Sequence, residues 1–276
     1  MDWNKTNTIL ITAFIILNVF LFASSNHLTK DDYNPNNDKE FVQGVAELLN
    51  QKNIKISADI PDKGFILPIL DTEYDIIQIN SQLLEQFLNE KIDPVEGVFT
   101  YYNNKGETLE IIDGKKLRLT LRDKVNDKLN EELNIKEEIN NFIKEKKIDA
   151  DKYVENLEHI SENECSYVYT QKYNDYFIDN SYMRFFADNE GIYKFEMQRI
   201  VSVTEIPEMV RTVHAIEALP RILTYPEIEN KEITRIEMTY YSVEDDNWQN
   251  IERINSDPTW KVIFNDGTQT HLPGID

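Results

Sequence analysis

The stretch Thr-Trp-Lys-Val-Ile-Phe-Asn-Asp-Gly-Thr-Gln-Thr-His-Leu at residues 259–272 predicts two antiparallel strands joined by a tight turn. Apolar and polar residues alternate before the turn, and Asn265-Asp266-Gly267 supplies residues that tolerate the positive φ of hairpin turns. A similar order of strand, Asn or Asp with Gly, and second strand occurs around Gly106 and Gly191. The pattern fits an internal duplication and, equally, independent hairpins that share one turn chemistry.

Outward from this hairpin, the rest of the chain divides into blocks of strands and blocks of helices. Period-two patterns and turn residues predict strands at 54–60, 65–70, 74–79, 95–102, 108–112, 117–121, 153–160, 165–173, 182–187, 192–203 and 233–241. Apolar residues at three-and-four spacing predict helices at 38–50, after Asn80, at 135–143 and at 216–223, the last containing Pro220. Hairpins join the strands, so we expect an α+β fold of antiparallel sheets with packed helices.

Residues 122–135 are charged and rich in Asn, which is typical of a boundary between structural units. We therefore expect two related extracytoplasmic subdomains, at 38–132 and 133–276. The chain has 276 residues, of which 41% are hydrophobic and 11% aromatic, enough to form a packed core. The single cysteine, Cys165, lies in a strand-like segment and is expected to be a buried apolar residue without a disulfide.

An apolar segment near the N-terminus predicts a membrane anchor. From Thr6 to Ser24 the chain has 19 uncharged residues in a row, which is long enough to span a bilayer. Lys5 precedes this segment, so the N-terminus is expected to be cytoplasmic. We expect a cytoplasmic tail at 1–8, a transmembrane helix at 9–25, a juxtamembrane linker at 26–37 and a single-pass protein of the cell membrane. The alternative is a cleaved signal peptide, since Ala23-Ser24-Ser25 offers small residues for cleavage.

Charge and motifs exclude several classes of function. The formal net charge is -21, which opposes binding to nucleic acid. The eight glycines are spread too widely for a phosphate-binding loop, and no histidine or cysteine spacing of a zinc site is present. No motif of a nucleophilic hydrolase occurs. The sequence therefore predicts no catalytic, cofactor-binding or metal-binding residue.

Asn18 is a polar residue inside the predicted transmembrane helix. Polar side chains at such depth usually face a protein partner, because hydrocarbon cannot satisfy their hydrogen bonds. Three-and-four spacing places Ile11, Phe14, Asn18 and Leu21 on one stripe of the helix. We expect this stripe to contact other transmembrane helices. The alternative is that Asn18 is tolerated because the helix is otherwise very apolar or because water reaches it.

The two ends of the chain resemble the YycI family. The start, Met-Asp-Trp-Asn-Lys-Thr at residues 1–6, runs directly into the apolar segment, as in that family. Near the C-terminus, Ile-Glu-Met-Thr-Tyr-Tyr at 236–241 and Asp-Pro-Thr-Trp-Lys-Val at 257–262 are similar to the family's strands, which read Gly-Tyr and then Pro-x-Trp-x-Ile. The sequence departs from the family at Thr239, where Gly is expected, and at His271-Leu272, where small residues are expected.

The resemblance implies a bitopic regulator of the WalK/WalR (YycG/YycF) two-component system of Gram-positive bacteria. It implies that the membrane helix associates with the transmembrane helices of the sensor histidine kinase, and that the ectodomain is related to that of a companion, YycH. No catalytic residues are known for the family. Our expectation is therefore a non-enzymatic regulator of the kinase, which pairs with a YycH-like protein. The alternative is a wall-associated enzyme or a protease-inhibitor-like module with a localising anchor.

Overall fold

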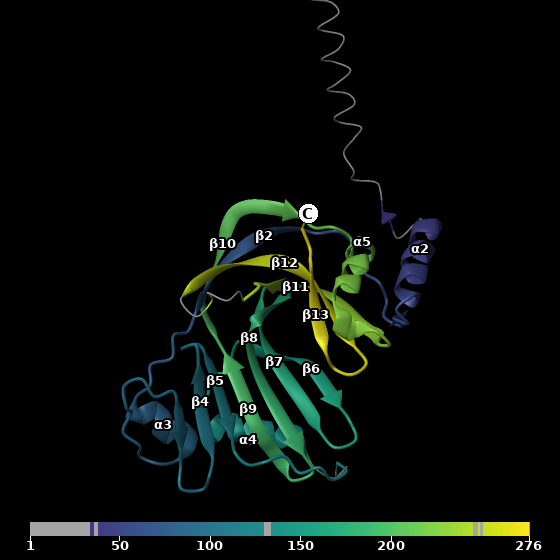
Figure 1. The fold of residues 1–276 in the computed structure, drawn as a ribbon. Coiled ribbons are helices and arrows are strands. Elements are labelled where there is room, and N and C mark those ends of the chain that lie inside the picture. Colours follow the sequence, from purple (N-terminus) through teal and green to yellow (C-terminus); the bar gives the residue numbers. More distant parts are fainter. Residues whose placement is uncertain (1–33, 36–37, 130–133, 245–247, 249–250, 276) are drawn as a thin grey trace, which may run out of the picture.

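The structure, a computed structural model, describes residues 34–35, 38–129, 134–244, 248 and 251–275. It is an α+β fold in which a large mixed sheet carries few helices (Figure 1). The helices are α2 (Lys39–Asn50), α3 (Ser81–Leu88), α4 (Ile135–Glu145) and α5 (Ala215–Ala218), with 3-10 helices η3 (Leu219–Thr224) and η4 (Pro226–Ile228). The strands are β1 (Lys55–Ile56), β2 (Ile66–Tyr74), β3 (Thr100–Tyr102), β4 (Thr108–Ile112), β5 (Lys116–Thr120), β6 (Tyr153–Ile160), β7 (Cys165–Tyr173), β8 (Tyr176–Asp188), β9 (Gly191–Gln198), β10 (Ile200–Arg211), β11 (Glu232–Tyr241), β12 (Arg253–Phe264) and β13 (Gln269–Pro273).

The strands are hydrogen-bonded in the order β10-β2-β12-β11-β8-β9-β5-β4-β3, with β1 beside β11, β13 beside β12, and β7 between β6 and β8. Most neighbours are antiparallel, as expected, but β11 is parallel to β8 and to β1. The expectation of purely antiparallel sheets was wrong at these two pairings. The chain returns to β11 after long connections that contain helices, and such connections allow parallel pairing. The parallel pairing of β11 with β8 is short, and Thr239 Oγ1 strengthens it by donating to the carbonyl of Phe177 at 2.8 Å.

The helices begin where the sequence predicts them. Asp38 caps α2, and its side chain accepts hydrogen bonds from the backbone N–H groups of Glu40 and Phe41. Asn80 caps α3 in the same way, accepting from the N–H of Leu83 at 2.8 Å. These caps satisfy donors that have no partner within the helix. Predictions of helices at both places are confirmed.

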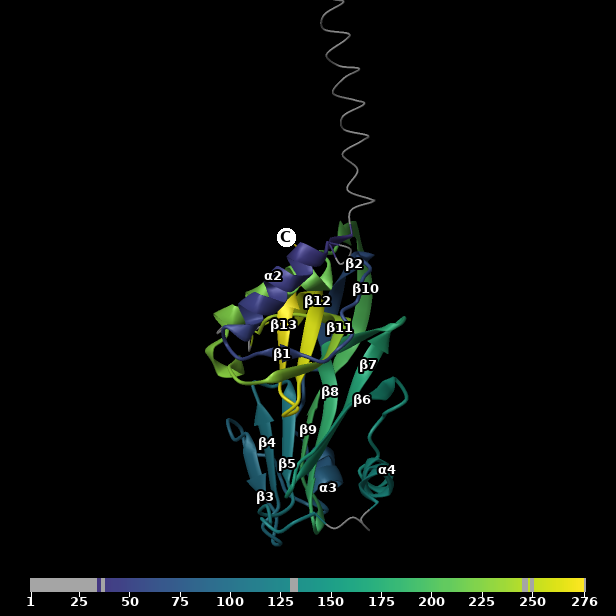
Figure 2. The same ribbon diagram turned by 90° about the vertical axis from the view of Figure 1, so that its right-hand side faces the viewer.

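The apolar core consists of three clusters on the sheet. One cluster lies between α3, α4 and the strands β4, β5, β7, β8 and β9, and contains a group of stacked and edge-on phenylalanines: Phe87, Phe142, Phe185 and Phe195. A second lies between α2, α5, η3 and the strands β11, β12 and β13, around Trp260. The third joins them through side chains of β2, β8, β10 and β11. Figure 2 shows α2 and the C-terminus at one end of the molecule, with α3 and α4 toward the other.

Several strands differ from their predicted limits. The segment at 54–60 contributes only β1, and residues 65–79 form one strand, β2, followed by an extended segment. The segment at 192–203 is divided at Arg199 into β9 and β10. The division has a physical reason, because β9 pairs with β8 and β5, whereas β10 pairs with β2. The turn between β4 and β5 is as predicted, with positive φ at Asp113 (50°) and Gly114 (68°).

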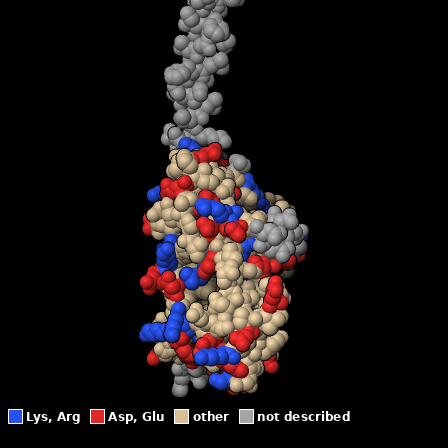
Figure 3. All heavy atoms as spheres, turned by 90° about the vertical axis from the view of Figure 1, so that its left-hand side faces the viewer, with Lys and Arg blue, Asp and Glu red and all other residues tan. Residues whose placement is uncertain are grey.

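The predicted tail at 1–8, the transmembrane helix at 9–25 and most of the linker at 26–37 lie outside the described residues. Within the described part of the chain, no helix is long and apolar enough to cross a membrane. Strands from both sides of the predicted boundary at 132 share the sheet, through β5 with β9 and β2 with β10. The division into two related subdomains stays a prediction. On the face shown in Figure 3, acidic and basic side chains are interspersed.

Candidate functional site

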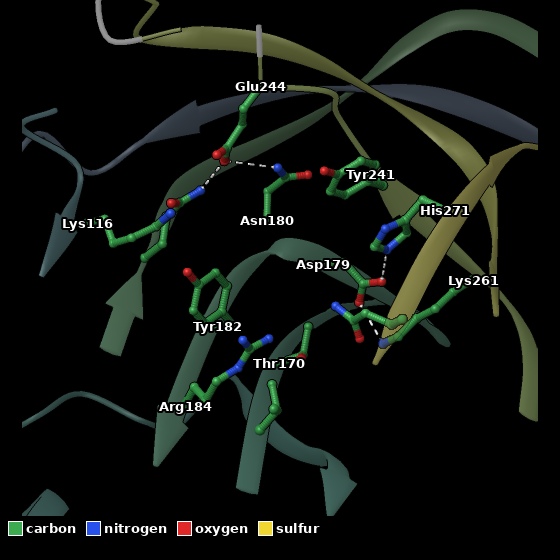
Figure 4. A pocket seen from close by; sticks show the side chains of 13 residues that line it. Lys116, Thr170, Asp179, Asn180, Tyr182, Arg184, Tyr241, Glu244, Lys261 and His271 are labelled. Atoms are coloured by element: carbon green, nitrogen blue, oxygen red, sulfur yellow. Dashed lines mark hydrogen bonds and ion pairs between the residues drawn. The ribbon is translucent and has the colours of Figure 1, made fainter. Parts of the chain in front are cut away.

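A cavity of about 250 Å³ lies where β8 passes from the strands of the first core cluster to those of the second (Figure 4). We call it the polar pocket. It is lined by side chains from seven strands and from the segment after β11: Lys116, Val168, Thr170, Asp179, Asn180, Tyr182, Arg184, Gln198, Tyr241, Glu244, Lys261, Gln269 and His271.

The alternation of side chains along each strand explains why the pocket is polar. On β8, Tyr182 and Arg184 face the pocket, whereas Met183 and Phe185 enter the first apolar cluster. On β12 the pocket residue Lys261 lies between Trp260 and Val262, which enter the second cluster. Successive side chains of a strand point to opposite faces, so one face builds the core and the other builds the pocket. The helices pack on the core faces.

Asp179 is the centre of a buried group of charges on one side of the pocket. Its Oδ1 accepts from Lys261 Nζ at 3.1 Å, and its Oδ2 lies 2.6 Å from His271 Nε2. Glu237, Lys261 and His271 stand directly opposite one another on β11, β12 and β13, which explains why Lys261 Nζ also lies 3.4 Å from Glu237. Burial tends to raise the pKa of Asp179, but Lys261 and His271 outweigh it and lower the pKa. The ring of Tyr241 stacks on His271 at 3.8 Å between centroids.

Glu244 reaches the other side of the pocket from the segment after β11 (Figure 4). Its Oε1 accepts from Gln198 Nε2 at 2.6 Å and from Asn180 Nδ2 at 3.2 Å, and Tyr74 Oη lies at 3.5 Å. Asn180 also exchanges two hydrogen bonds with the backbone of Ser242, at 2.7 and 3.0 Å. Asn180 thereby fixes the segment that carries the carboxylate. Burial and the nearby Glu244 raise the pKa of Tyr74, which keeps this phenol neutral.

A row of alternating charges runs across four strands of the sheet and ends at the pocket. Arg184, Glu196, Arg118 and Glu110 stand directly opposite one another on β8, β9, β5 and β4. Arg118 bonds to both carboxylates, to Glu196 at 2.8 Å and to Glu110 at 3.3 Å. Arg184 stands at the pocket end of this row and points into the cavity (Figure 4). Its guanidinium lies 5.5 Å from the centre of the Tyr182 ring.

Two buried polar atoms of the pocket have no hydrogen-bond partner among the described residues: Arg184 Nε and Gln198 Oε1. Gln198 is only 1% exposed, so bulk water does not reach its side chain freely. A buried donor or acceptor without a partner costs free energy, typically about 1–3 kcal/mol. The pocket therefore offers one unused donor on a cation and one unused acceptor.

The side chains around Asp179 and His271 offer charged and hydrogen-bonding groups to a ligand. Asp179 and His271 have the arrangement of a carboxylate that orients a general base. In the described part of the chain, however, no hydroxyl or thiol is hydrogen-bonded to the ring of His271, so this pair lacks a nucleophile. The described residues also contain no group of three acidic, histidine or cysteine side chains arranged to hold a metal ion.

The stripe predicted as a partner-binding site, Ile11, Phe14, Asn18 and Leu21, lies outside the described residues, and its role stays a prediction. The residues of the polar pocket were not predicted. Arg184, Lys261 and His271 lie in segments that the sequence predicts as strands, and nothing in those patterns assigned them a role in a site. The one available signal was the departure at His271-Leu272, since His271 is part of the Asp179 group.

Cys165 is buried, 3% exposed, in the first core cluster, as the sequence predicts. Burial raises the pKa of its thiol to about 11, and the carboxylates of Glu158 and Glu164 act in the same direction. A thiol with such a pKa is almost entirely protonated near neutral pH and is a poor nucleophile. The interpretation of Cys165 as a structural residue is confirmed.

Comparison with known proteins identifies one protein family. The family model described as YycI protein matches residues 34–272. No curated protein matches the sequence. Eleven chains of solved structures match, among them the following three. An uncharacterized protein from Eubacterium rectale has 9% identity and a TM-score of 0.41, over 83% of this chain and 94% of that one. YycH from Bacillus subtilis has 8% identity and a TM-score of 0.48, over 77% of this chain and about half, 53%, of that one. The C-terminal domain of YpeB from Bacillus megaterium has 12% identity and a TM-score of 0.32, over 69% of this chain and 95% of that one.

Proposed function

The chain belongs to the YycI family, and from this membership we propose that it is a non-enzymatic, membrane-anchored regulator of an essential sensor histidine kinase that controls cell-wall metabolism. The family match over residues 34–272 is the observation that carries the proposal. The polar pocket adds groups that can bind a ligand. The kinase is of the WalK/YycG type, and the companion is a YycH-like protein.

The position of α2 supports the proposed topology. If the membrane helix ends at 25, eight residues at 26–33 separate it from Asn34. Eight extended residues span at most about 28 Å. The end of the molecule that carries the start of α2 and the C-terminus therefore faces the membrane in our proposal (Figure 2). The ectodomain lies outside the cytoplasm, since Lys5 is on the N-terminal side of the apolar segment.

Regulation acts through the membrane helix in this proposal. Asn18 and its stripe neighbours contact the transmembrane helices of the kinase, and a hydrogen bond from Asn18 contributes about 0.6–2 kcal/mol to that contact. A change in the packing of these helices shifts the equilibrium between kinase states. The ectodomain holds the helix in register through its pairing with the companion.

The edge strand β10 is the surface that we assign to the companion. Among the described residues β10 pairs with β2 alone, so its other edge is open to a further strand. Large apolar side chains are exposed along this pair: Val201 (48%) and Met209 (57%) on β10 and Ile66 (60%) on β2. Both strands lie at the end of the molecule that carries the C-terminus (Figure 1). An exposed edge with apolar side chains favours association with another chain.

Co-purification from solubilised membranes tests the role of the helix. We expect Asn18→Leu to reduce recovery of the kinase several-fold and to change its autophosphorylation, with membrane insertion unchanged. Ile16→Leu is the control, because Ile16 lies on the face of the predicted helix opposite Asn18 and the same side chain is introduced. If Asn18→Leu and Ile16→Leu give equal recovery and equal kinase output at equal expression, the stripe assignment is wrong.

A second pair of variants tests the edge strand. Met209→Glu places a charge on the β10 edge and should lower recovery of the companion several-fold. Val154→Glu is the matched control, since Val154 is also exposed, 46%, but lies on β6. Equal recovery of the companion with both variants would show that pairing uses another surface.

A further inference from the structure

The polar pocket differs from a larger cavity of the molecule in how its charges are satisfied. That cavity, of about 500 Å³, lies against α3 and β9. Its arginine, Arg199, pairs with Asp75 at 3.6 Å, and the Gln86 amide donates to the backbone carbonyl of Lys146 at 2.5 Å. The polar pocket instead leaves Arg184 Nε and Gln198 Oε1 without partners among the residues that the structure describes. Unused groups of opposite character around one half-open pocket indicate a bound molecule that completes them.

We propose that the polar pocket binds a small zwitterion, such as a free amino acid or a short peptide, with its carboxylate on Arg184 and its ammonium group between Gln198 and Glu244. This inference is independent of the proposed contact with the kinase. In this inference the ectodomain detects a small zwitterion as a chemical signal.

Arg184 is suited to the carboxylate end. Its guanidinium points into the cavity (Figure 4), and its Nε is an unused donor. Glu196, which stands opposite Arg184, is bonded to Arg118 at 2.8 Å and so shares its negative charge with a second cation. The planar guanidinium fork can hold both oxygens of a carboxylate through two parallel hydrogen bonds. Thr170, 1% exposed, lines the pocket nearby.

Gln198 and Glu244 are suited to the ammonium end. Gln198 Nε2 donates to Glu244 Oε1 at 2.6 Å, which fixes the orientation of the amide, since a flipped amide would set two acceptors against each other. Gln198 Oε1 is therefore held as an acceptor without a donor. Glu244 adds a negative charge beside it. An ammonium group carries three donors and one positive charge, and satisfies both residues.

The placement of the charges on opposite sides and the size of the pocket suit a zwitterion. Figure 4 shows Glu244 and Arg184 on opposite sides of the cavity, with Tyr182 between them. One molecule with two opposite charges can bridge these sides. A volume of about 250 Å³ equals roughly eight water molecules of the bulk liquid, which suits an amino acid or a dipeptide. The Asp179 group on the third side is already satisfied and forms a rigid wall.

Calorimetric titration of the full chain in detergent micelles with the dipeptide alanylalanine tests the proposal. We expect saturable binding that weakens more than ten-fold in Arg184→Gln. Arg253→Gln is the matched control, because Arg253 is exposed and pairs with Asp71 and Glu73 outside the pocket, and should bind like the unchanged chain. Alanylalanine amide, which lacks the carboxylate, and N-acetyl-alanylalanine, which lacks the ammonium group, should each bind more than ten-fold more weakly.

Three outcomes would overturn the zwitterion assignment. The first is the absence of binding at millimolar dipeptide to a chain whose thermal unfolding is cooperative. The second is equal affinity in Arg184→Gln and Arg253→Gln. The third is binding of inorganic phosphate as tight as that of the dipeptide, which would mean that the pocket recognises an oxyanion alone. None of these outcomes affects co-purification with the kinase, so the two proposals fail separately.

Discussion

Strand β8 carries two charged sites that differ in their hydrogen bonding. At its end, Asp188 is fully buried and completely hydrogen-bonded: it accepts from Arg122 Nη1 at 2.7 Å and Nη2 at 2.5 Å, from the N–H of Val125 at 2.7 Å and from the N–H of Glu190 at 2.9 Å. Four residues earlier, Arg184 faces the polar pocket with its Nε unpaired. We call the first the Asp188 site.

The difference shows which site serves the fold. The Asp188 site joins the segment after β5 to the turn between β8 and β9, and every one of its groups has a partner in the chain. A buried charge with complete hydrogen bonding locks the local structure. The polar pocket, in contrast, leaves Arg184 Nε without a partner among the described residues. Binding of a ligand explains better than folding why Arg184 lies in this pocket with an unpaired donor.

The largest effect is expected for Asp188→Ala. The substitution leaves Arg122, which is about one quarter exposed (27%), without its bidentate partner and removes two backbone contacts. We expect a loss of about 3 kcal/mol in the free energy of unfolding, measured by urea denaturation. Glu190→Ala is the control, since Glu190 is 58% exposed and lies 4.0 Å from the same arginine; its cost should stay below about 0.5 kcal/mol. Equal costs for the two variants would contradict the assignment of the Asp188 site as structural.

The second-largest effect is expected in how the free energy of unfolding depends on pH, because of the Asp188 site. Burial tends to raise the pKa of Asp188, but Arg122 and the N–H groups of Val125 and Glu190 lower it from 3.8 to about 2. Because the folded pKa is lower than the unfolded one, this carboxylate stabilises the fold above about pH 4 and ceases to do so as the pH falls through 2. The contribution is about 2 kcal/mol. The free energy of unfolding, measured by urea denaturation, should therefore differ between the unchanged chain and Asp188→Asn at pH 5. This difference should shrink as the pH falls to 2. A difference that stays constant over this range would contradict the assignment.

The smallest effect on stability is expected at the pocket. Arg184→Gln removes an unpaired buried donor and breaks no ion pair to a described residue, so the free energy of unfolding should fall by no more than about 0.5 kcal/mol. The measurement is the same urea denaturation, without added dipeptide. A loss as large as that of Asp188→Ala would mean that Arg184 supports the fold, and the contrast between the two sites would disappear.

Local patterns were enough to predict most elements of this fold. Asp38 and Asn80 mark the starts of α2 and α3, and β4, β6 and β7 have the limits that their alternation predicts. Strand β10 was largely missed. Its second half contains Glu205, Pro207 and Glu208, which are untypical of a strand, but an edge strand tolerates a proline and the register shifts there.

The polar pocket could not be predicted, because its residues come together only through strand register. Glu237, Lys261 and His271 become neighbours when β11, β12 and β13 align, and no spacing along the chain indicates this. In a chain with 50 Asp and Glu residues, single charges in strand patterns carry little information. The transmembrane stripe was accessible to prediction for the opposite reason, since its four residues share one helix.

A crystal structure of the chain soaked with alanylalanine tests most directly whether the fold keeps Arg184 for a ligand. We expect density for the dipeptide in the polar pocket, with its carboxylate within hydrogen-bond distance of Arg184 Nε and its ammonium group near Gln198 Oε1. Ordered water alone at both atoms, in crystals soaked at a concentration that saturates the titration, would contradict the central claim that this pocket is a binding site.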